Sequence, residues 1–226
     1  MQVAHHITLL NQSLWLSPQR CIFWQEQQAL IVSDLHFGKT GHFRKAGIGI
    51  PQSVYKEDLQ RLVEQLHHFS PTQLIVVGDF FHSTINKELD WFLKWRNDFH
   101  QLTIHLIKGN HDILNKEWYE TSGINVIEPS LEIGPFCFVH DIKDAHSFNN
   151  APYYFSGHIH PGISIKGIAK QSISLPCYYF GKKFAVLPAF SKFTGKTSIV
   201  KKSGEQVFAI IPSNPNKSQL AAVIQI

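Results

Sequence analysis

The 226-residue chain has little cysteine and no arrangement of it that suggests cross-links. Its three cysteines, Cys21, Cys137 and Cys177, are scattered and form no CxxC pair. A disulfide scaffold is therefore excluded, and a reducing cytoplasm is the expected compartment. No apolar run approaches the roughly 20 residues that a membrane span needs, and the first residues lack the pattern of a signal peptide. We expect one cytoplasmic domain over residues 1–226, without membrane association.

Acidic residues are almost absent from the last part of the chain. Residues 161–226 contain nine Lys or Arg and one acid, Glu205, which gives +8, whereas residues 1–160 contain 12 basic and 16 acidic residues, which gives −4. All 14 histidines lie in the first part. A basic segment of this kind suggests an anionic partner, although a solvated lysine surface explains it equally well.

The pattern of apolar residues predicts an α/β protein. Continuous or alternating apolar runs indicate strands at 21–24, 29–33, 73–77 and 102–107, and helical spacing covers 51–69 and 86–99. From about residue 124 short alternating runs predict a second, mostly antiparallel sheet, with strands at 125–127, 136–139, 153–156, 184–187 and 206–211. Two facing sheets with helices outside make a four-layer α/β sandwich.

A polar motif follows each of several apolar runs. These motifs are Ser33-Asp34-Leu35-His36, Gly78-Asp79, Gly109-Asn110-His111-Asp112, His140 and Gly157-His158-Ile159-His160. Because the carboxyl ends of sheet strands form the binding crevice of open α/β sheets, we expect these side chains to meet. Imidazole, carboxylate and amide ligands without cysteine favour Mn, Fe or Zn over Ca. A pair of such ions about 3.5–4 Å apart is a known device for attack on phosphate esters.

The order D-x-H, GD, GNH[DE], H and GHxH resembles the calcineurin-like metallophosphoesterase superfamily. The resemblance implies two divalent metal ions. It assigns Asp34, His36 and His160 to the first ion, Asp79 to both ions, and Asn110, His140 and His158 to the second. It places His111 over the phosphate, where it would assist the leaving oxygen while a metal-bridging hydroxide attacks phosphorus.

One ligand and one neighbour of the site depart from the family pattern. His140 is not followed by the usual x-Pro, and His146 is an alternative ligand, although the strand directly before His140 favours His140. The protein Ser/Thr phosphatases carry GDxxDRG, whereas this chain has His82 at the acid and Ser83 at the arginine. A phosphoprotein monoesterase is therefore disfavoured. His82 is either a catalytic neighbour, bonded to His111 or to phosphate, or an ordinary turn residue.

The segments SDLHFGKTGHFRKAGIGIP and LPAFSKFTG are similar to the bacterial ligase-associated DNA damage response endonucleases. That resemblance implies a manganese-dependent phosphodiesterase acting on DNA. We therefore expect a DNA repair endonuclease that acts on single-stranded or unpaired DNA. The resemblance also implies association with an ATP-dependent DNA ligase, a helicase and an exonuclease-like protein. Two alternatives stay open: a hydrolase of small phosphodiesters such as cyclic nucleotides, and a non-catalytic DNA-binding repair scaffold.

Basic residues beside the first motif are candidates for substrate binding. Lys39, Arg44 and Lys45 could contact phosphates that flank the scissile bond, and Phe43 could stack on an unpaired base. The same loop could instead be a packed lid whose charges face water. A basic track could continue through Lys182, Lys183, Lys192 and Lys196, or these lysines could form an ordinary surface.

Overall fold

The first sheet is built in chain order. The computed structural model describes residues 3–39, 47, 53–82, 87–147, 151–166, 171–214 and 219–226. Within these residues the first sheet has seven strands: β1 His5–Leu9, β2 Gln12–Ser17, β3 Cys21–Trp24, β4 Ala29–Val32, β5 Gln73–Val77, β6 Thr103–Ile107 and β7 Ile124–Ile127. The first four strands are antiparallel hairpin strands, and β4 to β7 run parallel. Parallel neighbours bring the ends of β4, β5 and β6 to one edge.

Helices connect the parallel strands, as the β-α-β pattern predicts. They are α2 Ser53–Phe69, α3 Lys87–Asp98 and α4 Lys116–Thr121. The short α4 begins after Asn115, whose side chain accepts a hydrogen bond from the Trp118 backbone N–H at 2.9 Å. The start of the predicted helix at Pro51 lies outside the described residues. No described helix is long and apolar enough to cross a membrane.

The second sheet is mixed, with nine strands in the described part of the chain. Its strand order is β14-β11-β12-β13-β10-β9-β8, and β15 pairs with β12 and carries β16. The bounds are β8 Ser130–Ile133, β9 Phe136–Val139, β10 Tyr153–Ser156, β11 Pro161–Lys166, β12 Ser172–Phe180, β13 Phe184–Val186, β14 Thr197–Ser198, β15 Gln206–Ile211 and β16 Ala222–Gln225. The strands that precede the histidine motifs, β9 and β10, are parallel to each other and to β13.

The assignment of 125–127 to the second sheet is wrong. This segment is β7, and it pairs in parallel with β6, with His105 opposite Asn125. The reason is the six-residue α4, which returns the chain to the first sheet before the crossover to the second. The second sheet begins at β8 instead.

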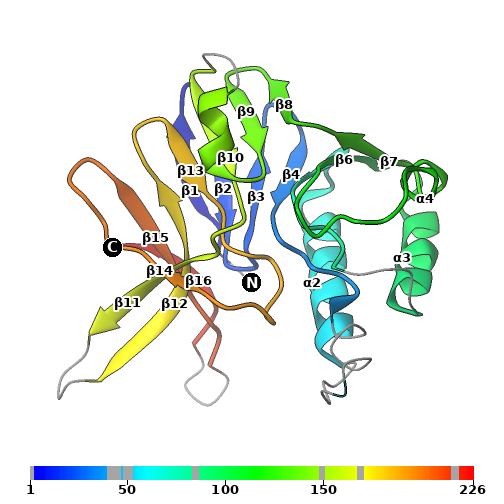
Figure 1. Cartoon of the computed structure of the whole chain (residues 1–226). Helices are drawn as coiled ribbons and strands as arrows, with labels where there is room; N and C mark the ends of the chain where they lie inside the picture. The colour runs from blue at the N-terminus through cyan, green and yellow to red at the C-terminus, as the bar shows by residue number, and fades with distance from the viewer. Residues whose placement is uncertain are drawn as a thin grey trace.

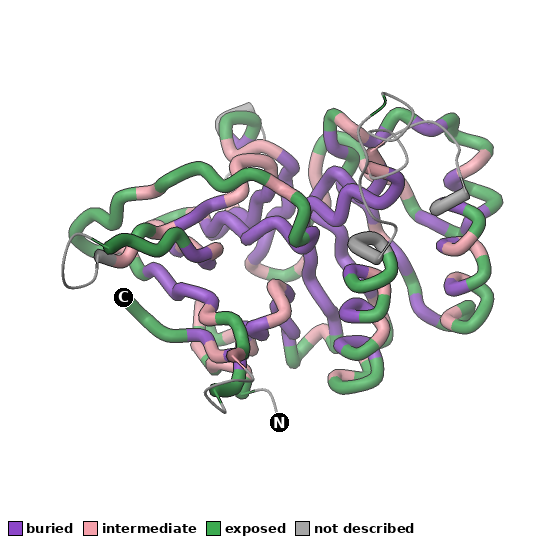
Figure 2. The backbone as a smooth tube through the Cα atoms, turned by 90° about the horizontal axis from the view of Figure 1, so that it is seen from below, coloured by how far each residue is buried: buried purple, intermediate pink, exposed green. Residues whose placement is uncertain are grey.

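Two hydrophobic layers confirm the predicted sandwich. One layer lies between the two sheets and contains Trp24, Ile75, Phe138, Phe155 and Tyr178. The other lies between the first sheet and the helices. Figure 1 shows α2, α3 and α4 together on the side of the first sheet that faces away from the second. The buried backbone runs through the middle of the molecule in Figure 2, with exposed residues on the outer turns. The 3-10 helix η1, Ile142–Ser147, packs on the outer face of the second sheet against β9 and β10.

Candidate metal centre

The polar motifs of both sheets meet at one edge of the sandwich, where β4, β5, β6, β9 and β10 end. The side chains gather in two groups. In one group Asp34, His36 and His160 each place a ligand atom within 4.8 Å of the others. Asp79, His140 and His158 form the other group by the same measure. We call them the first and second donor groups. Each group contains three of the residues that the family resemblance assigns to one ion.

Distances link the two donor groups through Asp79. Asp79 Oδ1 lies 3.7 Å from His140 Nε2, in its own group, and Asp79 Oδ2 lies 4.0 Å from His36 Nε2, in the other. Within the first group, His160 Nε2 is 3.3 Å from Asp34 Oδ1. A single buried carboxylate therefore faces both groups, which is the position of a bridging ligand.

Asn110 joins the second group. Its Oδ1 lies 3.0 Å from His140 Nε2, which is also 3.1 Å from His158 Nδ1. Asn110 Oδ1 and Asp79 Oδ1 are hydrogen-bond acceptors, and each neutral imidazole carries only one N–H. A single imidazole proton at this point cannot be shared by all of these atoms. A cation at their centre would. All seven predicted ligands are thus brought to the two groups.

The backbone at the site is strained. Five predicted ligands have a positive φ, namely Asp34 at 52°, His36 at 51°, Asp79 at 49°, His158 at 68° and His160 at 48°. Each such residue costs about 1–3 kcal/mol, and this strain persists where the surroundings hold it. The Asp34 N–H donates to the Gly78 carbonyl at 3.1 Å, and the His36 N–H donates to the Asp79 carbonyl at 2.9 Å. The two motifs therefore hold each other in the strained form.

Two of the motif glycines leave space for neighbouring side chains. A Cβ on Gly78, whose φ is +77°, would lie 1.8 Å from His140 Nδ1. A Cβ on Gly157 would lie 1.9 Å from Ser33 Oγ, which donates a hydrogen bond to Asp34 Oδ2. Each glycine allows one donor group to pack closely against the backbone.

Burial sets the protonation of His36 in the first group. It is the main cause that lowers the pKa of His36 far below its usual range, and Lys39 and the neighbouring imidazoles lower it further. His36 is therefore neutral, which is the form that binds metals. Its Nε2 and the Nε2 of His160 are buried and have no hydrogen-bond partner among the described residues. Buried nitrogen lone pairs without partners, beside two carboxylates, fit divalent cations.

His111 and His82 lie beside the first group. The His111 backbone N–H donates to Asp79 Oδ1 at 2.9 Å, and its ring centroid is 5.4 Å from that of His36. The His82 ring lies 4.1 Å from the His111 ring, centroid to centroid, and its Nδ1 is 3.3 Å from His36 Nδ1. His82 therefore contacts both a predicted ligand and the predicted catalytic histidine.

Residues 28–142 match the calcineurin-like phosphoesterase family over half of the chain. The chain belongs to this family. Among solved structures, this phosphoesterase is similar to the nuclease MPE of Pseudomonas putida, with 27% identity, a TM-score of 0.78, and coverage of 91% of this chain and 96% of that chain. It is also similar to YfcE, a phosphoesterase from E. coli, with 14% identity, a TM-score of 0.42, and coverage of 88% and 97%. No curated protein sequence matches it.

Sequence reasoning missed three polar residues that support the phosphoesterase site. Ser33 bonds to Asp34. Asp112 accepts from the backbone N–H groups of Phe81 and Gly109, each at 2.9 Å, and so ties the second motif to the third, while burial raises its pKa to about 7. Asp141 Oδ2 lies 3.8 Å from His158 Nε2. Asp112 directly follows His111 in the GNHD motif, and Asp141 directly follows His140. Their position next to predicted site residues is the sequence feature that could have identified them.

The predicted substrate residues are only partly described. Lys39 is half-buried, and burial lowers the pKa of its ammonium group. The carboxylates of Asp79 and Asp34 act in the opposite direction, which shows that Lys39 lies near both donor groups. Arg44, Lys45 and Phe43 lie outside the described residues, as does Ser83. His146 belongs to η1, but its side chain is outside the described part, so the choice between His140 and His146 depends on the position of His140 in the second group.

Proposed function

We propose that this phosphoesterase is a dinuclear-metal phosphodiesterase that acts as an endonuclease on single-stranded or unpaired DNA. The observation that carries the proposal is the position of Asp79, with one carboxylate oxygen 3.7 Å from His140 and the other 4.0 Å from His36. Ions in the two donor groups would share this carboxylate. The likeness to a nuclease at 27% identity over nearly the whole of both chains supports a nucleic acid as the substrate. The segments that are similar to ligase-associated endonucleases support DNA.

The residues around the two groups suit an in-line displacement at phosphorus. When bound, two divalent ions supply a water of lowered pKa and stabilise charge on the phosphoryl oxygens. His111 is tied to Asp79 through its backbone N–H, so its imidazole is held at a fixed place next to the donor groups. From there it donates a proton to the departing oxygen. His82 packs on the His111 ring and restricts its orientation.

The donor set bears on the metal. Carboxylate, amide and imidazole ligands accept Mn, Fe or Zn, and we propose manganese as the physiological ion. The segments that are similar to ligase-associated endonucleases support a cytoplasmic role in DNA repair. They also support association with an ATP-dependent DNA ligase, a helicase and an exonuclease-like protein.

Circular single-stranded DNA tests this function directly, because it has no ends and is cut only by an endonuclease. In the presence of Mn²⁺ we expect the wild-type protein to linearise the circle and to hydrolyse bis(4-nitrophenyl) phosphate. Asp79→Ala should reduce both rates by about a thousandfold. Asp90→Ala, which changes an exposed acid on α3, is the matched control and should leave both rates unchanged.

The alternatives give different results. Turnover of the small diester without DNA cleavage, at every Mn²⁺ concentration, would favour a hydrolase of small phosphodiesters. DNA binding without hydrolysis of either substrate would favour a scaffold.

A further inference from the structure

A small basic hollow lies against the first donor group. Its volume is about 40 Å³, which gives room for roughly three water molecules, close to the size of one phosphate group. The residues that line it include His160 itself, Pro176, Thr194 and the three cations Arg20, Lys192 and Lys196. We call it the basic hollow. Because a predicted metal ligand forms part of its wall, anything bound in it lies next to the reacting centre.

Backbone contacts fix the basic hollow relative to the first donor group. Arg20 Nη1 donates to the Ala189 carbonyl at 3.2 Å and to the Ser191 carbonyl at 2.7 Å. The N–H of Ser191 in turn donates to the Asp34 carbonyl at 3.2 Å. On the other wall, Thr197 follows Lys196 directly, and its N–H donates to the His160 carbonyl at 3.0 Å. The cations are therefore held close to two members of the first group.

The basic hollow carries uncompensated positive charge. Arg20 donates to carbonyl groups and has no ion pair within 4.0 Å among the described residues. The acid that acts on its charge is Asp58, which is itself paired with Arg61 at 2.8 Å. Lys192 reaches Glu57 at 4.0 Å, but both side chains are about half exposed or more, so water screens the pair. Lys196 Nζ donates to the Ser174 carbonyl at 2.8 Å. An anion would find cations here that are not already neutralised.

The hollow beside the second donor group has the opposite charge balance. It measures about 450 Å³, and its wall includes the acids Glu128, Asp141 and Asp144. Its basic residue Lys108 is paired with Glu128 at 2.6 Å. A phosphate chain is repelled on this side and attracted on the other.

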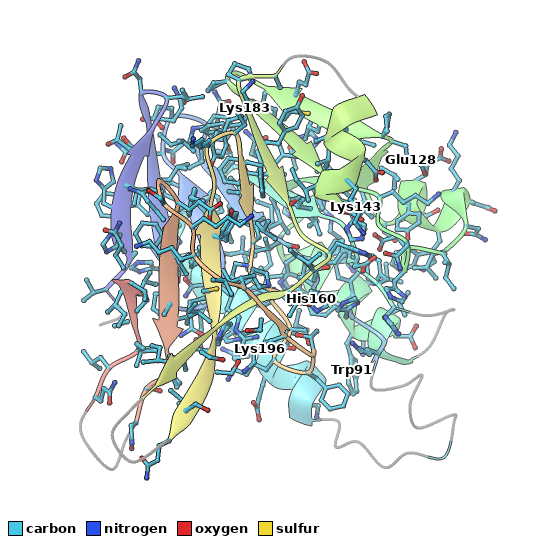
Figure 3. The ribbon with its side chains drawn as sticks, turned by 60° about the vertical axis from the view of Figure 1, so that its left-hand side comes forward. Trp91, Glu128, Lys143, His160, Lys183 and Lys196 are labelled. Atoms are coloured by element: carbon cyan, nitrogen blue, oxygen red, sulfur yellow. The ribbon has the colours of Figure 1, made fainter. Side chains whose placement is uncertain are left out.

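We propose that the basic hollow binds the phosphodiester adjacent to the scissile one, so that the substrate strand leaves the site past His160 rather than past His158. This inference rests on the proposed nuclease function and specifies the direction of the strand. It also divides the predicted basic track. Figure 3 shows Lys196 near His160, whereas Lys183 lies at the far end of the second sheet.

The test compares substrates with one and two phosphates. Wild-type protein with Mn²⁺ should cleave a trinucleoside diphosphate better than a dinucleoside monophosphate, because only the first has a phosphate for the hollow. The double variant Lys192→Gln/Lys196→Gln should lose about tenfold in kcat/KM on the longer substrate, and nothing on the shorter one. The matched control is Lys182→Gln/Lys183→Gln, which should behave as wild type.

A second measurement is the salt dependence of binding to a labelled single-stranded oligonucleotide in chelator. Loss of the single phosphate contact in the hollow should reduce the slope of log K against log salt by about 0.7, and the control should keep the wild-type slope. Two results would overturn this inference alone, provided that the wild-type protein binds and cuts DNA. One is an equal loss of kcat/KM on both short substrates in the Lys192/Lys196 variant, and the other is an unchanged salt slope in that variant. Wild-type protein that neither binds nor cuts DNA would overturn the nuclease function as well.

Discussion

At the scale of single residues, the site depends on backbone conformations that most side chains avoid. The predicted ligands with positive φ are aspartates and histidines, which tolerate the left-handed region better than β-branched residues. The sequence shows which residues stand at the strand ends, but it does not show this strain. The convergence of the predicted ligands could be predicted, because each of them follows the end of a strand. The exact position of Asp79 between the two groups could not, because it depends on how the two sheets pack against each other.

The close contact at Gly78 gives one prediction. Gly78→Ala puts a Cβ 1.8 Å from His140 Nδ1 at a φ of +77°, so the imidazole must move out of the second group. We expect a loss of about 1–3 kcal/mol in the free energy of unfolding and a weakened second metal. Urea denaturation and Mn²⁺ titration measure the two effects. Gly195→Ala, with no atom within 4 Å of its new Cβ, is the control, and equal behaviour of the two variants would contradict the prediction.

His82 gives a second prediction. Its Nδ1 lies 3.3 Å from His36 Nδ1, so it orients His36 with Nε2 toward Asp79. His82→Ala should weaken Mn²⁺ binding by about 10- to 100-fold, the usual effect of losing a group that orients a ligand. Calorimetric titration measures it, with His100→Ala at an exposed turn as the control. Unchanged affinity with lost hydrolysis would show that His82 acts on the substrate instead.

At the scale of elements, α2 holds the segment that supports Asp34. On α2, the Arg61 guanidinium lies 2.8 Å from Asp58 Oδ1 and donates to the Phe190 carbonyl. The Phe190 N–H then donates to the Ser33 carbonyl at 2.7 Å. A helix on the outer face of the first sheet is thus connected to the first donor group through the segment after β13.

This connection predicts a large effect at Asp58. Both the Asp58 and Arg61 side chains are almost fully buried, so Asp58→Ala leaves an unpaired buried guanidinium. We expect a loss of about 3–5 kcal/mol in the free energy of unfolding. Glu57→Ala, at the exposed neighbouring position, should change it by less than about 0.5 kcal/mol. Urea denaturation compares them, and similar midpoints for both variants would refute the role of Asp58.

The elements themselves were predictable to different degrees. The strand 73–77 is a continuous apolar run because both of its faces are covered, and its burial agrees. By contrast, β1 alternates between half-buried and exposed residues and begins with two histidines, so its pattern is weak. The hairpin β11–β12 contains Pro176 within a strand, which argued against a strand there. β12 continues into β13 through a tight hairpin, with Phe180 opposite Ala185. Its pairing with β15, with Phe180 opposite Gln206, is long-range, and no local pattern encodes it.

At the scale of the whole molecule, metal binding and stability are coupled. The two donor groups bring buried acceptor atoms close together. This arrangement costs free energy on folding, and bound cations would offset that cost. Addition of Mn²⁺ at about 100 times its Kd should stabilise the protein by about 2.7 kcal/mol, which corresponds to a rise in Tm of about 5–10 °C for a domain of this size. Scanning calorimetry with Mn²⁺ and with chelator measures it. Asp79→Ala should show little rise, and a wild-type Tm that ignores Mn²⁺ would contradict the assignment of the groups.

Both halves of the sandwich supply ligands. Four of them, Asp34, His36, Asp79 and Asn110, follow strands of the first sheet, and three, His140, His158 and His160, follow strands of the second. Metal binding therefore follows the synthesis of both halves of the sandwich. A chain that has emerged from the ribosome only as far as Asp141 does not yet include His160. The first donor group of Asp34 and His36 is therefore still incomplete at that stage. The first donor group, and with it phosphoesterase activity, can therefore form only after synthesis has passed His160 and both halves have docked.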